Sequence, residues 1–442
     1  MNQPRPGQKP DAAWQIQLLA DSAAELANRG ELQDAERVYR QILDIAPYHV
    51  RALNFLAGQT LSRGELDDAQ ALLERALRAA PERPVLHQNM GLLQKQRGNL
   101  EAALGWLDKA IALKPDHEFA SLHRGALLLE LGRRDEAMAA YRQAWKHLPN
   151  AEATANSPLT PPALRDLIME ATLQLRGAQL ELIHAELAPV LDEHGKDALR
   201  RVIDAADIYV GQRAPRHRHG LQRPSYIYLP DLEPQAFFDR SRFDWLPRLE
   251  SATAIIREEL QAALAADQGL APYVQVEAGT DPQQWSTLNG SRAWSALHLT
   301  KGGTPVEENR ARCPKTTRVV DSLPLPQIPG HAPEALFSIL QPGTYIPPHF
   351  GLANYKLVAH LPLMVPPDCA IRVGNETRGW TEGECLVFDD SFQHEAWNRS
   401  DKQRAVLILD IWHPDVTLAE QAGIGALVRG IAAFNRRYAP AG

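Results

Sequence analysis

Two histidines and one arginine carry the chemistry that the C-terminal part of this 442-residue chain suggests. His349 and His394 lie near the starts of short apolar runs, and Arg404 opens the most apolar run of the sequence. Two imidazoles on one face can hold a transition-metal ion such as iron(II) and leave further coordination positions open. Histidines in a β core can equally be structural, so the residues alone leave both alternatives open.

Arg404 shares one face of its predicted strand with Val406, Ile408 and Asp410, because side chains alternate along a strand. Both faces of the strand are largely apolar, which predicts that the guanidinium is buried. A buried guanidinium needs a carboxylate partner. Asp410 lies roughly 20 Å away along an extended strand. The partner is therefore either another acid of the protein or a bound dicarboxylate, which arginine grips through two parallel hydrogen bonds.

Short apolar runs broken by turn residues surround these three groups and predict an all-β barrel or jelly roll. The runs are Leu336–Leu340, Leu357–Leu363, Cys385–Phe388 and Ala405–Ile411. We expect an amphipathic helix at Phe243–Leu264 and a closing helix at Leu418–Tyr438. A further short strand is expected from Ser225 onward.

A repeat with a period of 34 residues fills the N-terminal part, marked in each of four units by a glycine, a later alanine and a later proline. The glycines are Gly30, Gly64, Gly98 and Gly132, and the prolines are Pro47, Pro81, Pro115 and Pro149. This period resembles the tetratricopeptide repeat, a helix pair whose stacked units form a concave surface. We expect residues 13–150 to form an all-α solenoid that contacts a protein or peptide, a rigid spacer or dimerisation arm being the alternative.

The segments beside the repeats are polar or mixed in character. Residues 1–12 are proline-rich and are expected to be disordered. Residues 151–223 are expected to form a linker, reaching to about residue 163, and then a bridging or capping helical segment. His217 and His219 form an H-x-H pattern, but no carboxylate or third ligand is near, which favours a solvated hinge over a metal site.

Composition narrows the possible functions. The formal net charge of −7 gives no electrostatic reason to expect nucleic acid or an anionic membrane surface. No apolar run is long enough to span a bilayer, and the N-terminus lacks the apolar core of a secretory signal. Scattered cysteines without C-x-x-C spacing suit a reducing cytoplasm, where we expect the protein to act. They are Cys313, Cys369 and Cys385.

Several longer motifs resemble the aspartyl/asparaginyl β-hydroxylase family. They are SILQPGT, HFGLAN, HLPL, IRVGNE, W-x-x-G, FDDSFQHEAWN and R-x-x-L-x-x-D-x-W-H-P, with ENRARCPKT upstream. The resemblance covers about residues 224–442 and implies a double-stranded β-helix, a relative of the jelly roll. It also implies dependence on iron(II), on 2-oxoglutarate as cosubstrate and on dioxygen.

The resemblance implies a role for each matched residue of the metal site. His349 and His394 match the two iron ligands of the family. Gly351 matches the glycine that the family has where other oxygenases carry a metal-binding acid. The absent carboxylate is therefore expected, with water filling its place. Asp389 and Asp390 are expected to cap and orient the loop before His394, with Asp390 near the metal but not bound to it.

The cosubstrate residues follow in the same way. Arg404 and Ser338 match the residues that hold the distal carboxylate of 2-oxoglutarate. His360 matches a histidine near the metal end of the cosubstrate, and Trp294 matches a tryptophan that lines the pocket. Members that act on epidermal-growth-factor-like domains carry an arginine where this chain has Val358, a departure that bears on the identity of the substrate. Lys356, on the same strand face, is a candidate to compensate.

By analogy with the family, the expected reaction is hydroxylation of the β-carbon of an aspartyl or asparaginyl residue in a protein or peptide that the repeats recruit. One alternative is a small-molecule or carrier-bound amino acid as substrate. Another is a non-catalytic repeat scaffold with a degenerate β domain, whose sequence support is Val358.

Overall fold

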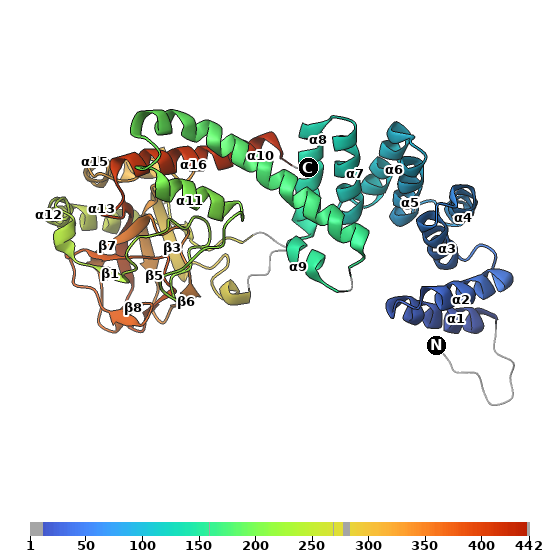
Figure 1. Ribbon diagram of the computed structural model, residues 1–442. Coiled ribbons are helices and arrows are strands. Elements are labelled where there is room, and N and C mark those ends of the chain that lie inside the picture. The colour runs from blue at the N-terminus through green and yellow to red at the C-terminus, as the bar shows by residue number, and fades with distance from the viewer. Residues whose placement is uncertain (1–11, 159, 268, 277–282, 440–442) are drawn as a thin grey trace. The chain divides into compact units, whose positions relative to one another are not determined.

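The computed structural model describes residues 12–158, 160–267, 269–276 and 283–439, which form two compact units (Figure 1). The first takes the chain up to Ala178 together with the stretch from Phe434 onward, and the second is Gln179–Ala433. Helices α10 (Pro162–His194) and α16 (Leu418–Arg437) each contribute residues to both units.

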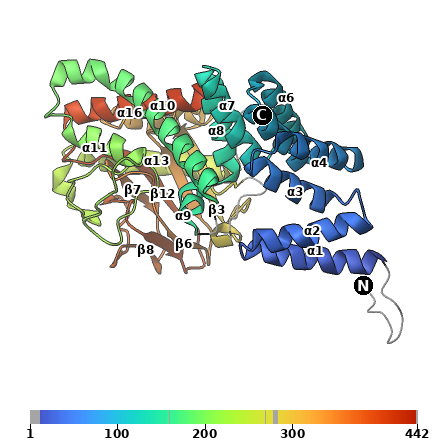
Figure 2. The same cartoon turned by 45° about the vertical axis from the view of Figure 1, so that its right-hand side comes forward.

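Paired antiparallel helices build the first unit, as the repeat predicts (Figures 1 and 2). Each repeat glycine adopts a positive φ between 73° and 80° and ends the first helix of its pair. The repeat alanines, such as Ala69 and Ala137, are fully buried where the two helices meet. The helices are α1 (Ala12–Asn28), α2 (Leu32–Ile45), α3 (Val50–Ser62), α4 (Leu66–Ala79), α5 (Pro84–Gln96), α6 (Leu100–Leu113), α7 (Glu118–Glu130) and α8 (Arg134–His147).

The end of α16 closes the first unit against α8. Arg142 on α8 donates to the carbonyls of Asn435 and Tyr438 at 2.9 and 3.0 Å. Arg437 forms an ion pair with Asp135 at 2.8 Å. The C-terminal end of the predicted closing helix therefore packs against α8 within the first unit.

Two expectations about connecting segments are wrong. The stretch assigned as linker contains the helix α9 (Ala151–Asn156), because its alanine-rich sequence favours helix despite the flanking prolines. The strand expected from Ser225 is only an isolated bridge between Ile227 and Ala353. A prediction based on local β propensity did not anticipate that this segment lacks a partner strand. The predicted helical segment is present as α10 and α11 (Arg200–Tyr209).

Two antiparallel sheets form the β part of the second unit. The larger has the strand order β1-β10-β7-β12-β5-β3-β2, with β4 also paired to β3, and the smaller has the order β6-β11-β8-β9. The large-sheet strands are β1 (Phe237–Phe238), β2 (Ala271–Pro272), β3 (Trp294–Lys301), β4 (Thr304–Pro305), β5 (Ala335–Leu340), β7 (Lys356–Met364), β10 (Leu386–Phe388) and β12 (Arg404–Trp412). The small-sheet strands are β6 (Tyr345–His349), β8 (Cys369–Val373), β9 (Glu376–Arg378) and β11 (His394–Asn398). This two-sheet architecture confirms the predicted fold class.

The large sheet is buried on both faces, which explains the continuous apolar run of β12. One face packs against helices α12 (Leu246–Ser251) and α13 (Thr253–Ala265) through residues such as Leu407. The other face lies toward the small sheet and carries Arg404. The predicted alternation along β12 is therefore confirmed.

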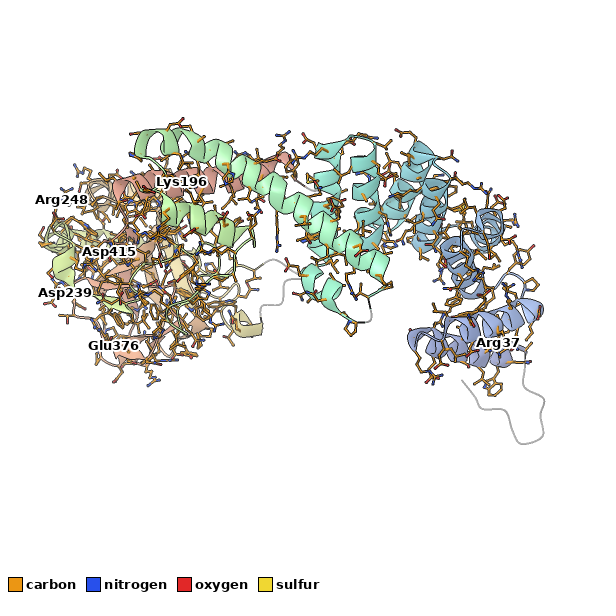
Figure 3. All side chains as sticks on the ribbon, viewed as in Figure 1. Arg37, Lys196, Asp239, Arg248, Glu376 and Asp415 are labelled. Atoms are coloured by element: carbon orange, nitrogen blue, oxygen red, sulfur yellow. The ribbon has the colours of Figure 1, made fainter. Side chains whose placement is uncertain are left out.

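The remaining elements lie around this core. They are the 3-10 turns η1 (Arg240–Arg242) and η2 (Gln283–Trp285) and the helices α14 (Glu307–Arg312) and α15 (Pro314–Asp321). Charged side chains such as Arg37 on α2 and Glu376 on β9 are exposed (Figure 3). None of the helices in the described part of the chain combines the length and apolar character needed to cross a bilayer.

Candidate active site

His349 and His394 lie side by side on neighbouring strands of the small sheet. They are register partners in the β6–β11 pair, and their ring centroids are 4.0 Å apart. The Nδ1 atom of His349 is 2.8 Å from the carbonyl of Pro347, and that of His394 is 3.0 Å from the carbonyl of Phe392. When Nδ1–H donates to a carbonyl, the lone pair lies on Nε2, where a metal ion can bind.

Burial keeps both imidazoles neutral. It lowers the pKa of His349 to about 4, and the adjacent His394 contributes in the same direction. Burial likewise lowers the pKa of His394 to about 4. A histidine must be neutral to bind a metal, so this pair is in the ligand form throughout the neutral range.

The position beside Gly351 is filled by a carboxylate from elsewhere in the chain. A Cβ placed on Gly351 would collide with the carboxyl group of Asp390, and the Gly351 amide donates to the Asp390 carbonyl at 2.7 Å. The Oδ1 atom of Asp390 is buried without a hydrogen-bond partner, and burial raises the pKa of this group. Asp390 therefore presents an unsatisfied oxygen near the histidines. Among the residues that the structure describes, no three His, Cys, Asp or Glu side chains form a cluster suited to a metal ion.

Asp389 stabilises the turn that precedes His394. Its carboxylate accepts from the Gln222 side chain at 2.8 Å and from the Ser391 amide at 2.9 Å. These bonds fix the turn that leads into His394, which agrees with the capping role expected from the sequence.

Arg404 is a buried cation that no acid neutralises in the described part of the chain. Its side chain is 1% exposed, and its Nε atom has no hydrogen-bond partner. Nη1 reaches the hydroxyl of Ser338 at 3.4 Å, and the guanidinium lies 4.8 Å from the centre of the Trp380 ring. Burial lowers the pKa of Arg404 to about 10. Of the two partners that the sequence left open, a protein acid is thus absent among the residues that the structure describes.

The remaining predicted cosubstrate residues surround Arg404. The Ser338 hydroxyl accepts from the Trp294 indole at 3.0 Å. His360 is 5% exposed, lies nearly parallel to Trp380 and has a buried Nδ1 without a partner. The structure therefore brings all six predicted site residues to one cavity.

This cavity has a volume of about 390 Å³ and is lined by both sheets. That size suits a small organic ligand. Its walls are mostly apolar and include Leu336, Ile346, Val358, Ile371 and Ile408.

A second buried cation, Lys356, lines the same cavity but is already paired. Its ammonium lies 2.7 Å from Asp410, and the two side chains are 6% and 4% exposed. The other Asp410 oxygen accepts from the Glu334 amide at 2.9 Å. Burial would lower the pKa of Lys356, but the negative charges of Asp410 and Asp390 outweigh it and raise this pKa.

Several aromatic residues of the site were not identified from the sequence. Trp380 contacts both Arg404 and His360. Tyr273 stacks on Trp294 at 4.1 Å, and Trp285 meets the His349 ring edge-on at 5.1 Å. Tyr273 and Trp285 lie in or beside short, irregular elements, so strand periodicity gave no signal for them.

Three other histidines of the second unit lie outside the cavity lining. His217 packs against Tyr228, and His219 accepts from the Leu221 amide. His413 is buried against Phe238.

Family models match two parts of the chain. Residues 250–414 match the family model described as Aspartyl/Asparaginyl beta-hydroxylase. Tetratricopeptide repeat models match residues 26–93, 60–125 and 120–146.

Three curated relatives show the range of the similarity. Human aspartate beta-hydroxylase domain-containing protein 2 is 33% identical over 213 residues, covering 47% of this chain and 55% of the relative. Human aspartyl/asparaginyl beta-hydroxylase is 33% identical over 186 residues, covering 41% and 24%. Ornithine lipid ester-linked acyl 2-hydroxylase of Rhizobium tropici is 36% identical over 180 residues, covering 40% and 60%.

The matches thus span about half of the length of the first of these relatives and less of the second. The chain thus joins a region that matches tetratricopeptide repeat models to a C-terminal region that matches the aspartyl/asparaginyl beta-hydroxylase family model.

Proposed function

We propose that the second unit is an iron(II)- and 2-oxoglutarate-dependent hydroxylase. The observation that carries this proposal is Arg404, a buried guanidinium that no acid of the described residues neutralises. It lies in the cavity that holds the adjacent imidazoles of His349 and His394. A dicarboxylate cosubstrate would supply the negative charge that pairs with the Arg404 guanidinium. The two Nε2 atoms would supply ligands for iron.

The side chains fit the metal in donor type and protonation. Two neutral imidazoles with their Nδ1 atoms tied to backbone carbonyls suit iron(II) and leave open positions for other ligands. Asp390 supports this fit, since its buried, unpartnered oxygen, which lies beside Gly351, can accept a hydrogen bond from a water molecule in the cavity. When bound, iron supplies the activation of dioxygen that hydroxylates a C–H bond while 2-oxoglutarate becomes succinate and carbon dioxide.

The chain's own residues position the cosubstrate. Arg404 and Ser338 hold its distal carboxylate, and the stacked Trp380 keeps the guanidinium in place. The unpartnered Nδ1 of His360 is available to the end nearer the metal. The apolar walls exclude water, which strengthens each of these charged contacts.

For the substrate, the family and its human relative point to the β-carbon of an aspartyl or asparaginyl residue. The repeats would recruit the protein or peptide that carries it. The Rhizobium relative favours a second candidate, because its name gives an acyl chain as the hydroxylated group. Free or carrier-bound amino acids are the third candidate substrate. The site residues argue against a purely non-catalytic scaffold.

The test is succinate release from 2-oxoglutarate by the purified full-length protein with iron(II) and ascorbate. We expect turnover that His394→Ala reduces by at least about 100-fold, in line with loss of a metal ligand's function. His184→Ala is the matched control, because His184 is exposed and does not line the cavity. Full turnover in the His394→Ala protein would refute the proposal.

A further inference from the structure

Three aromatic side chains form a continuous path from His349 to the surface of the second unit. The Trp285 ring meets the His349 ring edge-on, with 5.1 Å between the ring centroids, and Trp294 lies 6.5 Å from the same histidine. The two indoles are 6.2 Å apart, and Tyr273 stacks on Trp294 at 4.1 Å. Rings at these separations are in direct contact. We call Trp285, Trp294 and Tyr273 the aromatic path.

The two ends of the aromatic path differ in their contact with water. Trp294 is 5% exposed, and its indole N–H donates to the Ser338 hydroxyl at 3.0 Å, which fixes the ring inside the site. Tyr273 is 41% exposed, so a small reductant in solution can reach its ring. The path therefore joins the interior of the site to the solvent.

The easily oxidised rings lie on the His349 side of the histidine pair. The ring that faces His394 is Phe388, at 6.0 Å, and a phenyl ring is much harder to oxidise than an indole or a phenol. Another indole near the site, Trp380, has the Arg404 guanidinium 4.8 Å from its ring centre. Loss of an electron would turn that attraction into repulsion, which disfavours oxidation of Trp380. Packing alone does not require this one-sided arrangement of indole and phenol rings.

The proposed reaction creates a use for such a path. When no substrate is bound, conversion of 2-oxoglutarate and dioxygen to succinate and carbon dioxide leaves one oxygen atom and two oxidising equivalents in the site. Two electrons and two protons reduce that oxygen atom to water. Without a supply of electrons from outside, the nearest oxidisable side chains are attacked, a side reaction that a site must exclude. Trp285, in contact with His349, is the most endangered of them.

From these contacts we infer that Trp294 and Tyr273 conduct electrons from a one-electron reductant in solution, such as ascorbate, into the site when no substrate is bound. In each passage Tyr273 gives one electron toward the site and its phenolic proton to water, and the reductant returns one hydrogen atom to it. Two passages, with two protons from water, reduce the residual oxygen atom to water. The inference rests on the proposed function, because that reaction supplies the oxidant.

The test follows the full-length protein with iron(II), 2-oxoglutarate and dioxygen, without substrate or ascorbate. Electron paramagnetic resonance of rapidly frozen samples detects a tyrosyl radical, which we expect in the wild type and not in Tyr273→Phe, a variant that keeps the stacked ring. Tyr345→Phe is the matched control, because Tyr345 is 48% exposed, donates to Glu395 and does not line the cavity. It should keep the radical. An undiminished tyrosyl signal in Tyr273→Phe overturns the inference.

Ascorbate distinguishes the aromatic path from direct reduction inside the cavity. Peptide mass spectrometry measures how much Trp285 and Trp294 gain an oxygen atom for each succinate formed. We expect ascorbate to lower this ratio by at least about tenfold in the wild type and in Tyr345→Phe, but only slightly in Tyr273→Phe. A reductant that enters the cavity and acts there would protect all three proteins equally, and that result would contradict the inference.

A second variant interrupts the aromatic path in its interior. Trp294→Phe keeps an aromatic ring beside Tyr273 but removes the indole, so we expect the tyrosyl radical to disappear although Tyr273 is intact. A Trp294→Phe protein that forms succinate and keeps the radical excludes Trp294 from the path. Should this variant fail to fold, Tyr273→Phe decides.

Succinate, measured in the same samples, separates this inference from the proposed function. Absence of succinate in the wild type refutes the hydroxylase proposal and, with it, the electron path. Succinate formation without a tyrosyl radical in the wild type refutes the electron path alone.

Discussion

Two buried cations line the same cavity, and they differ in one respect. Lys356 has its counterion, Asp410, at 2.7 Å, whereas Arg404 has no acid partner in the described part of the chain. Their pKa values move in opposite directions. Burial lowers that of Arg404 to about 10, while neighbouring carboxylates raise that of Lys356 despite its burial.

This contrast indicates that the charge of Lys356 stabilises the fold, whereas the charge of Arg404 is suited to binding a ligand. A paired buried cation stabilises the fold it belongs to, because removing it leaves the partner uncompensated. An unpaired one destabilises the empty protein and is stabilised when a counterion binds. The following substitutions test the contrast, beginning with the largest expected effect.

Removing Lys356 should damage the fold most. Lys356→Met leaves Asp410 buried without its cation, so we expect the free energy of unfolding to fall by about 3–5 kcal/mol. Urea denaturation of the metal-free, full-length protein measures this. The double variant Lys356→Met/Asp410→Asn removes the orphaned charge and keeps an acceptor for the Glu334 amide. It should recover most of the loss, and an equally unstable double variant would contradict the pairing argument.

Arg404→Met should leave the stability of the ligand-free protein intact and weaken ligand binding, in contrast to Lys356→Met. We expect the free energy of unfolding of the ligand-free protein to be equal to or above that of the wild type, because the variant removes an uncompensated buried charge. Affinity for 2-oxoglutarate should fall by about 100-fold, as expected for loss of one partner of a buried charge pair. Denaturation and calorimetry measure the two quantities. Strong destabilisation of the ligand-free protein would indicate that Arg404 is structural.

Ser338→Ala should have a smaller effect on the same ligand. The variant removes one hydroxyl contact while Arg404 remains, so we expect 2-oxoglutarate to bind more weakly by about 1 kcal/mol, or roughly fivefold. Trp294 loses its acceptor at the same time. Calorimetry with Ser338→Thr, which keeps the hydroxyl, provides the control, and an unchanged affinity in Ser338→Ala would remove this serine from the site.

Alkaline pH should weaken the Lys356–Asp410 ion pair, and this is the smallest of the expected effects on stability. The folded-state pKa of Lys356 is raised, so its stabilisation is complete below the ordinary lysine value of about 10.4 and is lost as pH rises further. Relative to Lys356→Met/Asp410→Asn, the unfolding free energy of the wild type should fall above that pH by at most about 1.4 kcal/mol per unit. Parallel pH curves for the two proteins would contradict the raised pKa.

Local pattern predicted a large part of this architecture. The repeat glycines fixed the helix pairs because a positive φ is a local requirement. Alternation along β12 correctly placed Arg404 inside, because side-chain period depends on the strand alone. The proposed roles of His349 and His394 as metal ligands come from the family resemblance, since residue type alone did not separate ligands from structural histidines.

Features set by pairing between distant segments were not predictable. The Lys356–Asp410 ion pair depends on the register of β7 against β12, which places Asp410 opposite Val358. The position of Asp390 beside Gly351 depends on a loop packing against another strand end. Trp380 contacts Arg404 from outside any named strand. Such contacts follow from tertiary packing, which single-sequence patterns do not encode.

The most direct test asks whether Arg404 recognises a distal carboxylate. Calorimetry on manganese(II)-loaded, full-length protein would compare 2-oxoglutarate with 2-oxopentanoate, which has the same carbon chain but ends in a methyl group. We predict that 2-oxopentanoate binds at least about 100-fold more weakly to the wild type, and that Arg404→Met largely removes the difference. Equal affinities of the wild type for the two oxo acids would contradict the account.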